Sequence, residues 1–193
     1  MQRICVYCGS SLGRRPLYAE NARRLAQALV ERGLGLVYGG ASVGVMGVLA
    51  DAVLAAGGEV VGIIPRGLVA KEVGHSGLSD LRVVDSMHER KALMADRSDA
   101  FIALPGGIGT FEELCEIMTW SQLGIHAKPV GLLNVESFFD PFLRMLDHAV
   151  DEGFLKPPHR ETLLVSTSPA ELLNACAAYN PPPVRRWMTA EGM

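Results

Sequence analysis

Short apolar runs rich in β-branched residues alternate with longer amphipathic stretches along almost the entire chain. Apolar runs of strand length without polar alternation are typical of strands that are buried on both faces of a parallel sheet. The pattern predicts strands at residues 3–8, 34–38, 59–64, 81–84, 100–104, 130–134 and 163–166.

Between these strands, apolar residues recur at the spacing of helices that bury one face. Leu25 and Leu29, for example, share a face of the first such stretch, and Gly33 is a typical residue at which a helix stops. The predicted helices cover residues 16–32, 44–56, 87–97, 110–122, 138–152 and 169–179.

Strands that alternate with helices are expected to form a parallel sheet through right-handed crossovers. The sequence therefore predicts an α/β fold: a doubly wound, mostly parallel sheet with helices on both faces, Rossmann-like, in a single domain. We expect this domain to cover residues 1–180, followed by a C-terminal tail at 181–193. Residues 66–80 are polar and contain glycine, so they are predicted to form a loop over the strand ends.

The segment Leu-Pro-Gly-Gly-Ile-Gly-Thr-Phe-Glu-Glu, residues 104–113, joins a predicted strand to a predicted helix. Glycines let backbone N–H groups surround an anion, and the start of a helix adds unpaired N–H donors and the positive end of its dipole. Glu113 follows within one helical turn, which favours chemistry on a phosphorylated substrate over binding alone. The residues predicted to bind the phosphate are Gly106, Gly107, Ile108, Gly109 and Thr110.

Two more glycine-bearing turns follow predicted strands, at residues 8–11 and 38–44. Open α/β sheets bind ligands beyond the carboxyl ends of their strands, so three such turns predict a polar cleft suited to a phosphate. The further residues expected in this cleft are Gly9, Ser10, Gly39, Gly40 and Met87.

Composition narrows the classes of partner. Lys and Arg number 18 against 21 Asp and Glu, and a net charge of −3 gives no basis for nucleic-acid binding. No apolar stretch reaches the roughly 18–20 uncharged residues of a membrane span, and the N-terminus has too short an apolar stretch for a signal peptide. We therefore expect a cytoplasmic protein with no membrane partner.

The four cysteines predict neither a metal site nor a redox site. Cys5 and Cys8 form one Cys-x-x-Cys, but a zinc site requires a second pair or histidines at matching spacing. A redox pair is expected at the start of a helix, whereas Cys5 lies inside a predicted strand. Both are interpreted as small apolar residues in a reducing compartment.

The common nucleotide motifs are absent as well. Gly9 and Gly13 have the wrong spacing for the Gly-x-Gly-x-x-Gly of dinucleotide-binding proteins, and the second strand ends in Tyr38-Gly-Gly instead of a ribose-binding acid. The Gly-Lys-Ser/Thr of a P-loop is missing, and the five histidines form no i,i+4 pair. What remains is nucleotide chemistry with no redox cofactor and no metal.

A charge cluster, Met87-His-Glu-Arg-Lys91, begins the helix that precedes the phosphate-binding strand. In isolation such a cluster is typical of a solvated helix face. Its position instead predicts that Arg90 and Lys91 reach the cleft, where the planar guanidinium suits an oxyanion because it binds two oxygens.

Met87-His-Glu-Arg-Lys91, together with Pro-Gly-Gly-Ile-Gly-Thr-Phe-Glu-Glu at 105–113, resembles the Lonely Guy (LOG) family. These are the cytokinin riboside 5′-monophosphate phosphoribohydrolases, long mislabelled as lysine decarboxylases. The family signature Pro-Gly-Gly-x-Gly-Thr-x-x-Glu is satisfied at every fixed position, and the resemblance extends from residues 8–11 through 38–40 to 120–134.

The resemblance implies hydrolysis of the N-glycosidic bond in an N6-prenylated adenosine 5′-monophosphate, which releases the free base and ribose 5-phosphate. It also implies a nucleoside 5′-monophosphate as partner, no cofactor, and a homodimer or higher homo-oligomer with the site near the subunit interface. By resemblance, Arg90 and Glu113 are catalytic. Substrate contacts are implied at Glu72, Arg90, Lys91, Gly106 through Thr110, Glu113 and Thr119.

Glu113 is the candidate for chemistry at the sugar. Cleavage of the bond builds positive charge on the ribose, which a nearby carboxylate stabilises; alternatively, the carboxylate orients the attacking water. Arg90 is expected to bind the ribose or the phosphate and to hold Glu113 ionised. Only the signature selects Glu113 over Glu112.

The substrate and the reaction class are not settled by these residues. Ile108 replaces a usual aromatic residue, Leu93 a usual glutamate, and Asp96-Arg97 a usual basic-polar pair, so unmodified AMP is an alternative substrate. A non-catalytic nucleotide-binding module is a competing interpretation, as in relatives that bind a molybdopterin-type cofactor or DNA ends. Amino-acid decarboxylation is disfavoured because no lysine has a recognisable pyridoxal-phosphate setting.

Overall fold

The computed structural model describes residues 1–72, 74–78 and 80–182, so most of the expected tail, 183–193, lies outside the described residues. The strands are β1 (Arg3–Tyr7), β2 (Gly35–Tyr38), β3 (Val60–Pro65), β4 (Asp80–Val84), β5 (Ala100–Ala103), β6 (Val130–Leu133) and β7 (Leu163–Ser166). They form one sheet in the order β4-β3-β2-β1-β5-β6-β7, and every neighbouring pair is parallel. The predicted parallel α/β sheet is confirmed.

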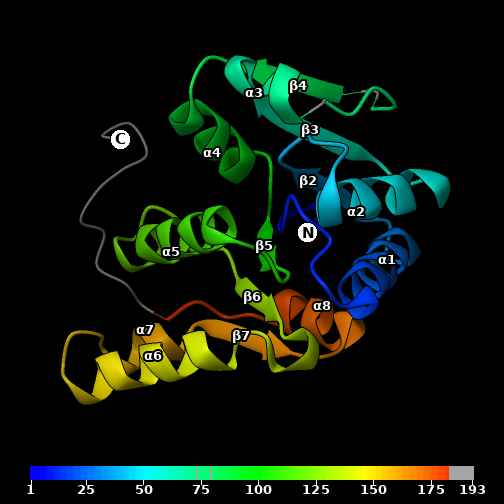
Figure 1. Ribbon diagram of the computed structural model, residues 1–193. Coiled ribbons are helices and arrows are strands. Elements are labelled where there is room, and N and C mark those ends of the chain that lie inside the picture. The colour runs from blue at the N-terminus through cyan, green and yellow to red at the C-terminus, as the bar shows by residue number, and fades with distance from the viewer. Residues whose placement is uncertain (73, 79, 183–193) are drawn as a thin grey trace.

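The helices cover both faces of the sheet. They are α1 (Pro16–Glu31), α2 (Gly44–Ala55), α3 (Arg66–Glu72), α4 (Met87–Asp96), α5 (Ile108–Gln122), α6 (Asp140–Asp151), α7 (Pro157–Glu161) and α8 (Pro169–Ala177), with the 3₁₀ turn η1 (Val135–Ser137). Helices α1, α2 and α8 lie on one side of the sheet, and α4, α5 and α6 lie on the other (Figure 1).

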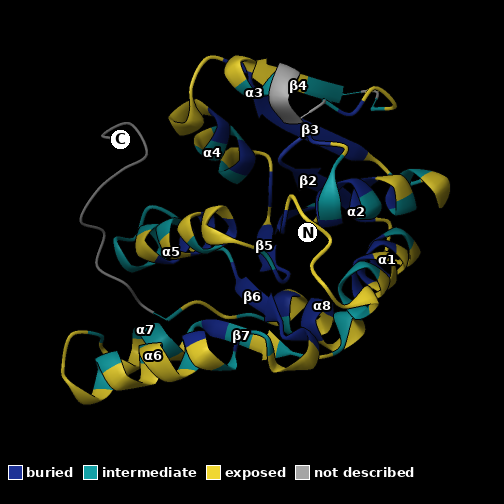
Figure 2. Cartoon of the chain, in the orientation of Figure 1, coloured by how far each residue is buried: buried dark blue, intermediate teal, exposed yellow. Residues whose placement is uncertain are grey.

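Each face of the sheet carries its own hydrophobic core. Because side chains alternate along a strand, Ile4 and Val6 of β1 belong to the core under α1, α2 and α8, whereas Cys5 and Tyr7 belong to the opposite core. The central strands are therefore buried on both faces, and the helices expose only their outer faces (Figure 2). This explains why the strands appear in the sequence as continuous apolar runs.

Two short helices were not expected from the pattern. Residues 66–80 were predicted to be a loop, but 66–72 form α3, and α7 lies in another segment with no predicted element. Both span less than the length over which helical periodicity can be recognised, and α7 begins with two prolines, which suit a first turn that needs no N–H donors. The Arg160 guanidinium also binds Asp147 of α6 at 2.8 Å, which holds α7 in place.

Helix α5 begins at Ile108 and not at Thr110 as predicted, because Gly107 provides the extended residue that precedes the first turn. Helix α6 begins at Asp140 and not at residue 138 as predicted, because the 3₁₀ turn η1 and its flanking residues connect β6 to α6. None of the described helices combines the length and the apolar character that crossing a bilayer requires.

The order of the strands determines where ligands are expected. The chain runs from β1 outward to β4 and then returns to place β5 on the other side of β1. The connections after β1 and β5 therefore diverge to opposite sides, which leaves a crevice at the carboxyl ends of these two central strands.

A carboxylate joins the amino ends of the same two strands. Asp99, directly before β5, accepts hydrogen bonds from the N–H groups of Gln2 at 2.5 Å and Arg3 at 3.1 Å. These hydrogen bonds hold the pKa of Asp99 below its ordinary value. A lowered pKa in the folded state adds stability at neutral pH, and this contribution is lost as the pH falls through the lowered pKa.

We expect Asp99→Asn to lower the free energy of unfolding at pH 7 by about 1 kcal/mol, because the group is exposed and screened by solvent. Urea denaturation of both proteins between pH 7 and pH 2 measures the difference. It should shrink as the pH falls, since the wild-type carboxyl then becomes neutral like the amide. A difference that stays constant over this range would contradict the assignment.

Candidate active site

A cleft of about 270 Å³ opens at the carboxyl edge of the sheet, and we call it the Arg90 cleft. It combines apolar side chains, a glycine-rich backbone, one guanidinium and two carboxylates. Its lining residues are Cys8, Gly9, Ser10, Met46, Leu68, Met87, Arg90, Gly107, Ile108, Gly109, Thr110, Glu112 and Glu113.

The three glycine-bearing turns meet at this edge. The Gly9 N–H donates to Pro105 O at 3.3 Å, which joins the turn after β1 to the turn after β5. The N–H groups of Val45 and Met46, at the start of α2, donate to Gly9 O at 3.0 and 3.3 Å. Gly44 has a φ of +62°, and a Cβ there would overlap the backbone of Ser10. Close backbone approach is thus one reason for the glycines.

The start of α5 forms the anion-binding part of the cleft. Gly107 is the extended residue before the helix. It has no side chain that could accept a hydrogen bond from the first N–H groups of α5. A Cβ at Gly106 would overlap Thr110 Oγ1, whereas a Cβ at Gly107 or Gly109 would meet no atom of the described residues within 4 Å, apart from chain neighbours and the backbone of α5 itself. Gly106 is therefore required for packing, and Gly107 and Gly109 keep the entrance of the site open.

Arg90 and Glu113 face each other in the cleft. The Arg90 Nη2 lies 3.7 Å from Glu113 Oε1, and the two side chains are only 7% and 11% exposed. The Arg90 Nη1 also lies 3.6 Å from the sulfur of Met87. In the described part of the chain, the buried Arg90 Nε has no hydrogen-bond partner. An unpaired buried donor is costly, which points to an acceptor that a ligand would supply.

The beginning of α4 fixes Arg90. Ser86 Oγ accepts the N–H of Glu89 at 3.0 Å, and the Glu89 carboxylate accepts the N–H of Asp85 at 2.8 Å. This reciprocal arrangement resembles a capping box, which sets where the helix starts. It places Arg90 in the first turn, directed into the fold, while Glu89 stays exposed.

Lys91 lies between two carboxylates of α5. Its ammonium binds Glu112 at 2.5 Å and Glu116 at 2.9 Å, and it does not line the Arg90 cleft. Burial lowers the pKa of Lys91, but hydrogen bonds to the two carboxylates outweigh this and leave it raised. Glu112 and Glu116 thus face Lys91 of α4, beside the Arg90–Glu113 pair that joins the same two helices.

The other predicted site residues lie around the cleft. Thr119 Oγ1 donates to Cys115 O at 2.7 Å, within α5 and outside the cleft lining. The carbonyl of Gly40 accepts the N–H of His75 at 3.0 Å, and Gly39 lies against the Arg90 guanidinium. Glu72 is the last residue of α3, and its side chain is outside the described part of the structure.

Several lining residues escaped the sequence analysis. Leu68 lies in α3, which the pattern did not predict, and Met46 lies on α2, whose residues were not predicted to line a cleft. Glu112 was considered only as the alternative to Glu113. Alternation of buried and exposed positions gives no signal for residues that line a cleft from an otherwise buried helix.

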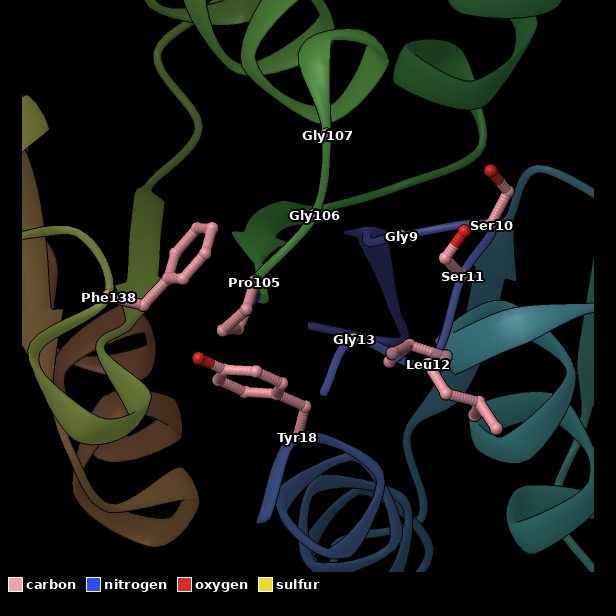
Figure 3. A pocket seen from close by; sticks show the side chains of 11 residues that line it. Gly9, Ser10, Ser11, Leu12, Gly13, Tyr18, Pro105, Gly106, Gly107 and Phe138 are labelled. Carbon is pink, nitrogen blue, oxygen red and sulfur yellow. The ribbon is translucent and has the colours of Figure 1, made fainter. Parts of the chain in front are cut away.

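A second hollow, of about 280 Å³, adjoins the Arg90 cleft at Gly9, Ser10 and Gly107. We call it the Tyr18 pocket. Figure 3 shows the rings of Tyr18, from α1, and Phe138, from the segment after β6, near Pro105. Its remaining lining residues are Ser11, Leu12, Gly13, Val45 and Gly106.

The Cys-x-x-Cys pair occupies the environment expected of apolar residues. Cys5 and Cys8 are both buried and free, and burial raises the pKa of each thiol well above its ordinary value. The thiolate form is therefore disfavoured. Redox exchange and metal binding both require the thiolate, so these two cysteines are unsuited to either role.

Comparison with known proteins identifies the family. The family model described as "Possible lysine decarboxylase" matches residues 46–176. The probable cytokinin riboside 5′-monophosphate phosphoribohydrolase LOGL5 of Oryza sativa subsp. japonica is 52% identical over 94% of this chain and 74% of its own length. The cytokinin riboside 5′-monophosphate phosphoribohydrolase LOG5 of Arabidopsis thaliana is 52% identical over 93% of this chain and 79% of its own.

Solved structures share the fold at lower identity. The molybdenum cofactor binding protein of Rippkaea orientalis has a TM-score of 0.69 at 22% identity, over 92% of this chain and 96% of that one. The Moco carrier protein of Chlamydomonas reinhardtii has a TM-score of 0.67 at 21% identity, over 90% and 94%. These likenesses establish the architecture alone. The identity and coverage of the plant relatives, in contrast, show that this chain belongs to the LOG family.

Proposed function

We propose that this protein hydrolyses the N-glycosidic bond of N6-prenylated adenosine 5′-monophosphates and releases the free base and ribose 5-phosphate. One structural observation carries the proposal: a buried carboxylate, Glu113, lies beside Arg90 and within two turns of the open start of α5, in a single cleft. The plant phosphoribohydrolases that are 52% identical to this chain support the same reaction.

Glu113 acts at the sugar in this proposal. The leaving base creates positive charge on the ribose, and a carboxylate close to that ring stabilises the oxocarbenium-like transition state or orients the attacking water. Burial strengthens this interaction because few waters screen it. Arg90 places a positive charge beside Glu113, which favours its ionised form, and the unpaired Arg90 Nε offers a donor to the ribose or phosphate.

The phosphate is proposed to bind at the start of α5. Backbone N–H groups and the positive end of the helix dipole converge there, with Gly107 and Gly109 leaving room for the anion. Binding energy from this remote group positions the anomeric carbon near Glu113. We assign direct substrate contacts to Arg90, Glu113 and the 106–110 segment. Contacts at Glu72, Lys91 and Thr119 stay predictions from the family resemblance.

We propose a nucleotide-binding domain at residues 1–180 and a tail at 181–193. A homodimer or higher homo-oligomer with the site near the subunit interface, and a cytoplasmic location, also stay predictions.

Decarboxylation of lysine, which the name of the family model suggests, is disfavoured by Lys91. A lysine that forms a Schiff base must be able to lose its proton. Lys91 instead binds two carboxylates, and its pKa is raised. Two competing functions use the same cleft: hydrolysis with a preference for unmodified AMP, and nucleotide binding without turnover.

One assay tests the proposal and separates it from these two functions. The purified protein is incubated with AMP and, separately, with isopentenyl-AMP, and free base and ribose 5-phosphate are quantified by chromatography. We expect base release, faster from the prenylated nucleotide. Faster release of adenine from AMP would make the protein an AMP nucleosidase, and tight binding with no base from either nucleotide would overturn the proposed hydrolysis.

A further inference from the structure

Gly39, the residue directly after β2, occupies a position that only a glycine can share with the Arg90 side chain. A Cβ built on Gly39 would overlap Arg90 Nη2 and would lie 3.3 Å from Arg90 Cζ and 3.1 Å from Met46 Sδ. The overlap with the guanidinium nitrogen is far inside van der Waals contact. The guanidinium thus occupies space that a side chain on residue 39 would fill.

The backbone does not require a glycine at this position. Gly39 is not among the described glycines with positive φ, whereas its neighbour Gly40 has a φ of +77°. Gly40 is therefore a glycine because other L-residues rarely adopt a positive φ. An alanine could adopt the backbone conformation of Gly39, so the reason for the lack of a side chain is the neighbouring guanidinium.

The atoms that a methyl group on residue 39 would displace belong to a flexible side chain. The overlapping atom is at the end of the Arg90 side chain, whose four torsions allow it to move. In contrast, a Cβ on Gly106 would meet Thr110 Cβ, and a Cβ on Gly44 would meet the backbone of Ser10. A methyl group at position 39 is therefore expected to move the guanidinium and not to disrupt the sheet. Movement would change the 3.7 Å separation between Arg90 Nη2 and Glu113 Oε1.

We infer that Gly39 is a positioning residue for the reaction: its lack of a side chain holds the Arg90 guanidinium at the depth where it faces Glu113 and the substrate. The inference rests on the proposed function and deepens it. Gly39 does not line the Arg90 cleft, but it determines the position of Arg90, which does. Gly39 touches no substrate; it acts through Arg90.

A double-mutant cycle tests the inference. Wild type, Gly39→Ala, Arg90→Lys and the double variant are compared in kcat, in KM and in the Kd for AMP measured by calorimetry. Lysine keeps the charge but lacks the Nη2 branch that the new methyl group would meet. We expect Gly39→Ala to lower kcat/KM by about 10²-fold in the wild-type background, the size of a misplaced catalytic group. In the Arg90→Lys background, Gly39→Ala should lower kcat/KM by less than about twofold, because the effects of substitutions at interacting residues are not additive.

Two controls separate positioning from folding. Gly67→Ala, in helix α3, adds a methyl group that meets no atom of the described residues within 4 Å apart from its own helix and chain neighbours, so it should leave activity unchanged and should not lower Tm. Gly40→Ala should lower Tm because of its positive φ, whereas Gly39→Ala should not.

The outcomes distinguish this inference from the proposed function. Equal losses from Gly39→Ala in both Arg90 backgrounds would overturn the positioning role while base release by the wild type upholds the function. If the wild type releases no base from either nucleotide, the proposed function fails, and the same cycle is evaluated on the Kd for AMP. An AMP affinity that Gly39→Ala leaves unchanged in the wild-type background would then overturn the inference as well.

Discussion

Glu113→Gln is expected to lower kcat for base release by about 10³-fold or more, while ribose 5-phosphate still binds with near wild-type affinity. The amide has nearly the same shape as the carboxylate but carries no negative charge for the cationic sugar of the transition state. Because the phosphate is proposed to bind away from the chemistry, at the start of α5, ground-state affinity should change little. Steady-state kinetics and calorimetry with ribose 5-phosphate measure the two quantities.

Glu112→Gln is the matched comparison for this variant. Glu112 precedes Glu113 on α5 and also lines the Arg90 cleft, but its carboxylate binds Lys91, which keeps a second partner in Glu116. Its loss in kcat should therefore be smaller than that of Glu113→Gln by at least about tenfold. Turnover of Glu113→Gln close to that of wild type would remove this residue from the mechanism.

Gly107→Val is expected to weaken the binding of ribose 5-phosphate by about 10²-fold or more and to raise KM for the nucleotide correspondingly. The backbone at Gly107 is extended, and a Cβ there meets no atom of the described residues within 4 Å apart from its chain neighbours, so we expect the fold to tolerate the branched side chain. The valine methyl groups instead occupy the space in front of the first N–H groups of α5. Calorimetry with ribose 5-phosphate checks the affinity, and thermal unfolding checks the fold.

Gly106→Val provides the contrast. A Cβ on Gly106 overlaps Thr110 Oγ1, so this substitution should lower Tm as well as affinity. If Gly107→Val bound ribose 5-phosphate as tightly as the wild type does, the phosphate would not bind at the start of α5.

The fold was accessible from the sequence because its central strands are buried on both faces. Continuous apolar runs such as 100–104, separated by helical periodicity, leave few arrangements apart from a doubly wound parallel sheet. Helix α3 was missed because its seven residues are too few to carry a periodic signal, although Leu68 reaches the cleft. The exact start of α5 depends on the extended conformation of Gly107, which composition does not determine.

The candidate site was accessible only in part. Glycines beside an acid predicted the anion-binding turn. The same reasoning could not distinguish glycines that have different structural roles. Gly107 leaves space for a ligand, Gly44 allows backbone to approach Ser10, and Gly39 makes room for a guanidinium.

The two adjacent cations show the same limit. Arg90 and Lys91 are neighbours in the sequence, but Arg90 faces Glu113, whereas Lys91 faces Glu112 and Glu116. Such differences arise from side-chain direction across two helices, which no single-sequence pattern records.

The position of β5 has a kinetic consequence. Arg90 and Glu113 lie on the two helices that flank β5 in the chain, and this strand pairs with β1 through partners as distant as Ile4 and Ala100. Pairing of segments so far apart is slow to form because a long loop must close first. In a refolding experiment, recovery of turnover should therefore lag behind the regain of helical circular dichroism from local segments such as α1 and α2.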